Sequence, residues 1–95
     1  MKPHLRFEWD EAKRRSNLRR HGIDFAAVAE VFENASSTVL DDRYDYGEER
    51  FLTLGLLKGR VVAVSHTWKD DVIRIISARR ASKDEEIKYF KEIWN

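Results

Sequence analysis

Two adjacent arginines end an apolar segment in the C-terminal half of the sequence, and their position suits the binding of an anion. The segment 74–82 reads RIISARRAS, in which Arg79 and Arg80 follow a run that is rich in isoleucine. Ser82 and Glu85 then form the S-x-x-E capping box that begins many helices. The donors of a guanidinium group match two oxygens of a phosphate or a carboxylate at once. The sequence therefore predicts a strand that presents two guanidinium groups beside the start of a helix.

The other residues with suitable chemistry fit the cleavage of RNA without a metal. RNA supplies its own nucleophile, the 2′-OH, so a protein needs only to accept one proton, donate another and stabilise the extra charge on the phosphate. The candidates for these catalytic roles are Arg79 or Arg80 for the phosphate charge, His66, Glu49 or Glu48 for the base, and Lys13, His21 or Tyr89 as further contributors. The candidates for binding RNA are Lys13, Arg14, His21, Arg50, Lys69 and Arg74.

Several of these candidates also have a purely structural interpretation. Arg79 and Arg80 can form salt bridges with the acidic residues of 41–49 or 84–86. His21 stands at a predicted helix C-terminus, where the helix dipole favours an imidazolium. Tyr89 can lie at the rim of the core, since a buried tyrosine needs only one hydrogen-bond partner. The sequence alone leaves both interpretations open.

Several classes of protein lack support in this sequence. It has no cysteine, so it has neither disulfides nor a thiolate zinc site, which suits a reducing cytoplasm. Its three histidines lack the spacing of a metal site, and no GxSxG or phosphate-binding glycine motif occurs. No apolar run approaches the roughly 18 residues that suggest a membrane helix. We therefore expect a cytoplasmic protein that uses no cofactor and does not bind a membrane.

Basic and acidic residues alternate in blocks along the chain, although the formal net charge is only +1. Lys and Arg outnumber Asp and Glu by seven to three in residues 1–20 and by seven to two in 58–83. Acids outnumber bases by eight to two in 21–57. If the two basic blocks meet in the fold, they form one positive surface for nucleic acid. The alternative is a set of separate solvated faces.

The chain, 1–95, has the length of a single domain. A first helix is predicted from the cap Asp10 to His21, where Gly22 ends it, and Asp24 caps a second helix. Strands are predicted at 37–40, 50–57, 60–68 and 72–79, with an acidic loop at 41–49, and a last helix at 83–94. Residues 7–9 are interpreted as an extended lead-in. This order predicts an α+β fold with two N-terminal helices, an antiparallel sheet of about four strands and a C-terminal helix.

Alternation along two strands predicts which of their residues share a face. One face of 60–68 carries Val62, Val64, His66 and Trp68, and the other carries Val61, Ala63, Ser65 and Thr67. One face of 72–79 carries Ile73, Ile75, Ser77 and Arg79, opposed to Val72, Arg74, Ile76, Ala78 and the following Arg80. Each face becomes polar toward one end, which predicts an open end of the sheet as the place of a site.

Several short motifs together resemble the BrnT family, toxins of bacterial type II toxin–antitoxin pairs. They are FEWD at 7–10, HGIDF at 21–25, VF at 31–32, GEER at 47–50 and RIISAR at 74–79, with Lys13, Asn17, Glu86 and Tyr89 at matching places. The resemblance implies a compact ribonuclease of RelE-like fold that cleaves RNA and lowers translation until its antitoxin, BrnA, binds it. It also implies that the antitoxin binds DNA and that the complex represses its own operon, so operator DNA is contacted through the antitoxin.

Two hypotheses remain beside a metal-independent endoribonuclease that a protein partner neutralises. One is a non-enzymatic module that binds nucleic acid or a protein, and the other is a toxin scaffold that has lost its activity. A nuclease requires a base and an acid within hydrogen-bond reach of the arginines, which a binding module does not need.

Overall fold

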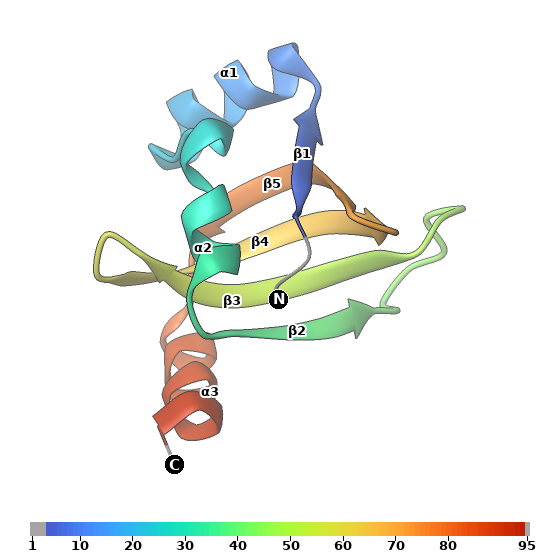
Figure 1. Cartoon of the computed structure of the whole chain (residues 1–95). Helices are drawn as coiled ribbons and strands as arrows, with labels where there is room; N and C mark the ends of the chain where they lie inside the picture. The colour runs from blue at the N-terminus through green and yellow to red at the C-terminus, as the bar shows by residue number, and fades with distance from the viewer. Residues whose placement is uncertain (1–3, 95) are drawn as a thin grey trace.

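Five strands form one mixed sheet in the computed structural model, which describes residues 4–94 (Figure 1). The strands are β1 (Arg6–Trp9), β2 (Ser36–Asp41), β3 (Arg50–Leu57), β4 (Arg60–Lys69) and β5 (Val72–Arg80). Their order in the sheet is β1-β5-β4-β3-β2, and all neighbours pair antiparallel except β1 and β5, which are parallel. The predicted α+β class is confirmed.

The prediction of about four strands in an antiparallel sheet is wrong at one edge. Residues 7–9, interpreted as a lead-in, belong to β1, which pairs with β5 from Arg6 opposite Val72 to Trp9 opposite Ile75. Parallel neighbours need a long crossover between them, so no turn beside β1 signals this pairing in the sequence. Because β1 leads directly into the first helix, it fixes where that helix starts above the sheet.

The helical segments of the described residues are α1 (Glu11–His21), the 3₁₀ turn η1 (Phe25–Ala27), α2 (Ala29–Glu33) and α3 (Lys83–Trp94). The predicted caps of α1 are confirmed. The Asp10 carboxylate accepts a hydrogen bond from the backbone N–H of Lys13 at 3.0 Å. Gly22 ends the helix with a left-handed φ of 71°, and its N–H donates to the carbonyl of Leu18. The second predicted helix is instead the turn η1, capped by Asp24, followed by the short α2.

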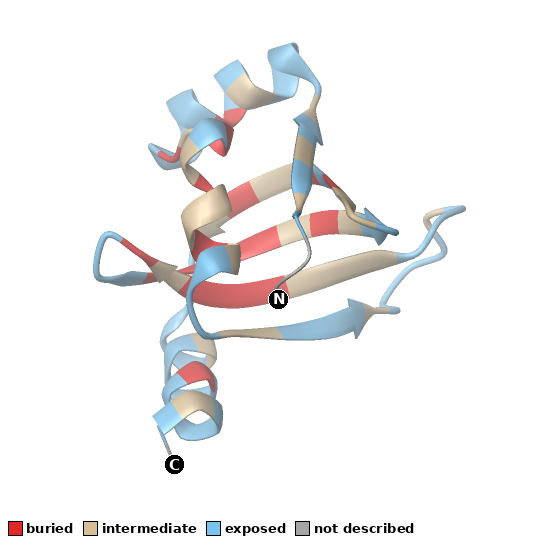
Figure 2. Ribbon diagram, viewed as in Figure 1, coloured by how far each residue is buried: buried red, intermediate tan, exposed pale blue. Residues whose placement is uncertain are grey.

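Two apolar cores lie on the two faces of the sheet. On one face α1, η1 and α2 enclose a core that contains Phe25, Val28, Val31, Val62, Val64, Ile73 and Ile75. On the other face α3 covers a core of Leu54, Val61, Ala63 and Tyr89. Figure 2 shows the buried residues gathered on the central strands and on the adjoining parts of the helices. The predicted alternation of β4 is confirmed, since its even-numbered valines and its odd-numbered Val61 and Ala63 enter different cores.

A β-bulge reverses the predicted faces in the second half of β5. Ser65 of β4 pairs with Ser77, but the next residue, His66, pairs with Ile75, so Ile76 has no partner opposite it. Beyond an extra residue of this kind, the alternation of the strand changes phase. Ala78 therefore enters the same core as Ile73 and Ile75, although the alternation predicted that it would oppose them. The predicted face of Arg79 is corrected in the same way, and Arg79 lies on the side of α3.

The side chain of Asn17 completes the outer edge of β5 where β1 no longer pairs with it. Its amide donates to the carbonyl of Ala78 at 2.8 Å and to that of Ile23 at 3.0 Å, and its carbonyl accepts from the N–H of Ala78 at 3.1 Å. Asn17 is buried, with 7% of its surface exposed. The two bonds to Ala78 fix α1 against the end of β5, and the bond to Ile23 holds the segment that follows the helix.

Candidate nucleic-acid interface

The structure does not bring the candidate catalytic residues Arg79, Arg80, His66, Glu49 and Tyr89 together. His66 pairs with Ile75 near the middle of β5, while Arg80 pairs with Val62 at its end. His66 and Val62 are four positions apart along β4, which corresponds to about 13 Å at ~3.3 Å per residue. Glu49 precedes β3 at the opposite end of the sheet.

His66 is fully buried among aromatic rings, and both of its ring nitrogens have hydrogen-bond partners. Its exposed fraction is 0%, its ring stacks on Phe51 at a centroid distance of 6.0 Å, and the ring of Phe32 meets it edge-on at 5.1 Å. Nε2 lies 2.7 Å from the hydroxyl of Thr53, and Nδ1 lies 3.0 Å from the carbonyl of Thr67. Burial lowers the pKa of His66 below its usual value of 6.5, so the neutral ring is favoured. This environment suits a structural histidine that RNA does not reach.

We predict that His66 makes the folded state less stable in mild acid. Since the folded protein binds its proton less readily than the unfolded chain, the free energy of unfolding falls as the pH drops below 6.5. One proton gives a slope of at most about 1.4 kcal/mol per pH unit. Urea unfolding measured from neutral pH down to about pH 5, above the titration of most carboxyl groups, should show this slope. His66→Gln should flatten it, and equal slopes in both proteins would contradict the prediction.

Tyr89 lies in the core under α3. It is 1% exposed, and its hydroxyl donates to the carbonyl of Ala35 at 2.9 Å. Burial raises the pKa of its phenol, so the protonated form is favoured. This matches the structural interpretation that the sequence left open.

Arg79 is held by a carboxylate of its own chain. Its guanidinium donates to both carboxylate oxygens of Glu85, at 2.7 and 3.1 Å. Glu85 also takes part in the predicted capping box, which is confirmed: it accepts from the N–H of Ser82, whose hydroxyl accepts from the N–H of Glu85. The bond from Arg79 lowers the pKa of Glu85 to about 2. Arg79 therefore joins β5 to α3 with the bidentate geometry that the sequence predicted for an anion.

Arg80 lies on the other face of the sheet, in a different environment. It is exposed and lines a cavity of about 570 Å³ between the end of α1, the β3–β4 turn and the end of β5. His21, Lys58 and Arg60 line the same cavity, and so does Asp24, which is bound to Arg14 at 3.1 Å. A histidine and three cationic side chains from three elements thus surround one opening.

A second cavity continues this basic surface along α1. It is lined by Lys13, Arg20 and His21 of the helix and by Ser77 of β5, among others, and has a volume of about 240 Å³. His21 belongs to both cavities and stands between them. We call the set Lys13, Arg20, His21, Lys58, Arg60 and Arg80 the α1–β5 basic surface. Residues from the two basic blocks of the sequence therefore meet in space, which is one of the two arrangements that the charge pattern left open.

The cationic residues differ in whether an acidic side chain of the same protein already pairs with them. Within residues 4–94, no ion pair involves any of the five cationic residues of the α1–β5 basic surface. Arg14, by contrast, donates to Glu11 at 2.6 Å and to Asp24. Arg50 and Arg74 both bind Glu48 at the other end of the sheet, where Lys69 and Glu49 also lie. Cations without an internal partner are the ones most available to phosphate.

Sequence reasoning missed Asn17 as a positioning residue and overlooked Arg20, Lys58 and Arg60 as candidates for binding. The basic block 58–83 was a signal for Lys58 and Arg60, but only the fold places the β3–β4 turn beside the end of α1. Nothing in the sequence shows that Asn17 bonds to the backbone of Ala78, which lies 61 positions away.

No group of three or more His, Cys, Asp or Glu side chains within residues 4–94 is arranged to hold a metal ion. In the same part of the chain, no helix has the length and apolar character needed to cross a membrane.

An exposed basic surface beside a histidine is the electrostatic feature that small proteins use to bind nucleic acid. The family model described as "Ribonuclease toxin, BrnT, of type II toxin-antitoxin system" matches residues 9–85, and the chain belongs to this family. It is thus a ribonuclease toxin by family, which implies RNA as its target and an antitoxin as its partner. Among curated proteins, none matches the chain significantly.

Proposed function

We propose that this protein is an endoribonuclease that cleaves RNA without a metal, at the cavity between α1 and the end of β5. The observation that carries this proposal is that His21 and Arg80 line one cavity of about 570 Å³ and approach it from different elements. His21 carries an imidazole that can accept or donate a proton, and Arg80 carries a permanent charge with a fork of donors.

The proposed reaction uses the nucleophile that RNA provides. Neutral His21 takes the proton of the 2′-OH, and the 2′ oxygen attacks the adjacent phosphorus. The guanidinium of Arg80 stabilises the charge that builds up on the phosphate oxygens. The bond between the phosphorus and the 5′ oxygen then breaks, and this oxygen takes a proton from water. The upstream fragment ends in a 2′,3′-cyclic phosphate. His21 is exposed, so it returns its proton to solvent.

The remaining residues of the α1–β5 basic surface are proposed to bind phosphates on either side of the cleaved bond. Lys13 and Arg20 lie along α1, while Lys58 and Arg60 lie at the β3–β4 turn. Each phosphate that they neutralise releases roughly 0.7 counterions from a single strand. RNA affinity should therefore fall steeply as the salt concentration rises.

The partner is proposed to be a BrnA-like antitoxin that covers the α1–β5 basic surface and competes with RNA for it. In this proposal the complex represses its own operon through DNA contacts of the antitoxin, and the single toxin domain acts in the cytoplasm. The family resemblance also suggests a RelE-like topology for this domain.

The experiment that tests the proposed function is cleavage of labelled RNA by the purified protein in EDTA. We expect cleavage that weakens with added salt, and we expect His21→Asn to lower its rate by on the order of 10²-fold, as loss of a general base does elsewhere. RNA that is retained by the protein but remains uncut in both EDTA and Mg²⁺ would instead support a binding module.

A further inference from the structure

A second cluster of cations lies at the opposite end of the sheet from the α1–β5 basic surface. Arg74 and Lys69 line a cavity of about 400 Å³ together with Trp68, Thr67, Glu48 and Glu49. In Figure 1 the loop 41–49 and the β3–β4 turn project from opposite ends of the sheet. Along β5, Arg74 and Arg80 are six residues apart, which corresponds to about 20 Å. A strand of RNA must be longer than the cleaved dinucleotide to reach both places.

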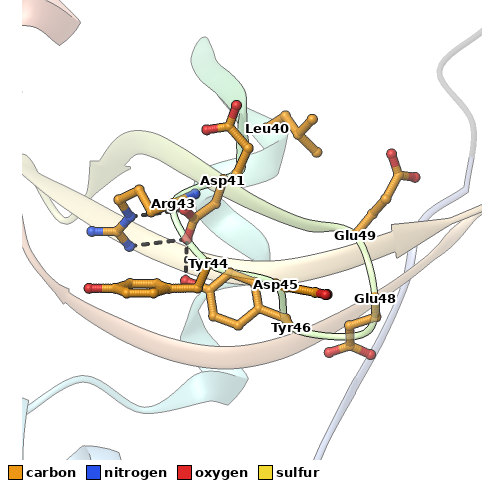
Figure 3. A pocket seen from close by; sticks show the side chains of 9 residues that line it. Leu40, Asp41, Arg43, Tyr44, Asp45, Tyr46, Glu48 and Glu49 are labelled. Atoms are coloured by element: carbon orange, nitrogen blue, oxygen red, sulfur yellow. Dashed lines mark hydrogen bonds and ion pairs between the residues drawn. The ribbon is translucent and has the colours of Figure 1, made fainter.

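One carboxylate, that of Glu48, binds two arginines in this cluster. Nη2 of Arg74 lies 2.7 Å from each carboxylate oxygen of Glu48, and Nε of Arg50 lies 3.2 Å from one of them. The two arginines belong to strands β5 and β3, whereas Glu48 belongs to the loop between β2 and β3. In Figure 3 the side chains of Glu48 and Glu49 point away from each other, so the neighbouring carboxylate is not part of this contact.

The position of the Glu48 carboxylate is suitable for a phosphate. A phosphodiester, like a carboxylate, shares one negative charge between two oxygens, which guanidinium donors bind at such distances. The side chains of Arg74 and Glu48 are 46% and 35% exposed. Ion pairs with this much exposure contribute little stability, so exchange of the carboxylate for a phosphate costs little.

An aromatic surface adjoins the same cavity. Trp68 is 37% exposed, and its indole N–H donates to the carbonyl of Asp70 at 3.2 Å. Its ring also meets Phe32 edge-on at a centroid distance of 6.0 Å. An indole held in this way offers a face on which a base can stack, as in many proteins that bind single strands.

We infer that Arg74, Arg50, Lys69 and Trp68 form a nucleotide subsite for single-stranded RNA, and that Glu48 occupies its phosphate position in the free protein. The cations bind a phosphate remote from the cleaved bond, and the indole stacks on a base of the same strand. This inference rests on the proposed function only in taking RNA as the ligand. Glu48 acts as an internal competitor that lowers RNA affinity without touching the reacting groups.

The test compares Glu48→Gln with Asp42→Asn, which removes one negative charge from the same loop at an exposed side chain. Binding of a fluorescent single-stranded oligoribonucleotide should be roughly five-fold tighter for Glu48→Gln than for Asp42→Asn, the size of effect expected for release of an exposed ion pair. The KM for long RNA should fall by a similar factor, while kcat and the cleavage of a dinucleotide stay unchanged. Combining Glu48→Gln with Arg74→Ala should abolish the gain.

Equal RNA affinities for Glu48→Gln and Asp42→Asn, at equal melting temperatures, would overturn the inference. Tighter binding of polyglutamate but not of RNA would also overturn it and assign the cluster to an acidic protein. Trp68→Leu distinguishes stacking on the base from binding of the phosphate. It should weaken RNA binding and leave pyrophosphate binding unchanged. Tighter RNA binding by Glu48→Gln without any cleavage would support the subsite and contradict the proposed nuclease.

Discussion

Arg80→Ala should lower RNA cleavage by on the order of 10²-fold, the usual loss when one donor to the transition state is removed. The melting temperature should change little, because Arg80 is exposed and forms no ion pair within residues 4–94. Arg80→Lys should recover only part of the rate, since lysine keeps the charge and loses the fork of donors. Single-turnover cleavage rates and thermal melts on the same preparations provide the measurement.

Arg79→Ala is the matched control, because it removes the same side chain one position earlier. Its pair with Glu85 is partly exposed, at 40% and 21% for the two side chains, so its loss costs on the order of 1 kcal/mol. For a domain of this size, this corresponds to a melting temperature lower by about 4–8 °C. The remaining folded protein should cut RNA at nearly the normal rate. A large loss of cleavage for Arg79→Ala with normal cleavage for Arg80→Ala would reverse the assignment.

Asn17→Leu should destabilise the fold by about 3 kcal/mol or more, the largest effect on stability that we expect from a single substitution. The change leaves the N–H and carbonyl of Ala78 and the carbonyl of Ile23 buried without the partner that now serves them. Each buried group that loses its hydrogen bond costs about 1–3 kcal/mol. This is a large share of the ~5–15 kcal/mol that stabilises a typical domain.

The neighbouring substitution Ser16→Ala controls for the helix itself, since Ser16 is exposed on α1. Urea unfolding of both variants is the measurement, and a loss of less than about 1 kcal/mol for Asn17→Leu would mean that water or local movement replaces the amide. Because Asn17 fixes α1 to the end of β5, Asn17→Asp should also weaken RNA cleavage in the fraction that remains folded. That effect would identify Asn17 as a positioning residue for His21 and Arg80.

The local signals in the sequence predicted the helix ends well. Asp10, Gly22 and the Ser82–Glu85 capping box each depend on residues a few positions apart, so the sequence contains all that is needed to recognise them. The β1–β5 pairing and the bulge at Ile76 depend instead on residues that are distant in sequence or on a change of register. Neither has a local signature, and both altered the predicted geometry.

The candidate residues were chosen for the chemistry of their side chains and not for a known position in the fold. This explains why several of them do not lie together in the structure. His66 and Arg79 each lie near the polar end of a strand, but β4 and β5 are antiparallel, so these ends point in opposite directions. The bulge then places Arg79 and Arg80 on faces other than the predicted ones. Burial favours the neutral form of His66, and only the packing of its ring against Phe32 and Phe51 shows that the residue is buried. The charge blocks predicted the position of the basic surface better. Each block covers many residues, so the wrong placement of one residue changes the prediction little.

The most direct test of the central claim uses RNA that carries a single 2′-deoxynucleotide at the cleaved position. The wild-type protein, in EDTA, should cut the all-ribose strand and leave a 2′,3′-cyclic phosphate on the upstream fragment. It should leave the substituted strand uncut at that position while binding it with unchanged affinity. Cleavage of the 2′-deoxy position at the normal rate would contradict attack by the 2′-OH and with it the proposed roles of His21 and Arg80.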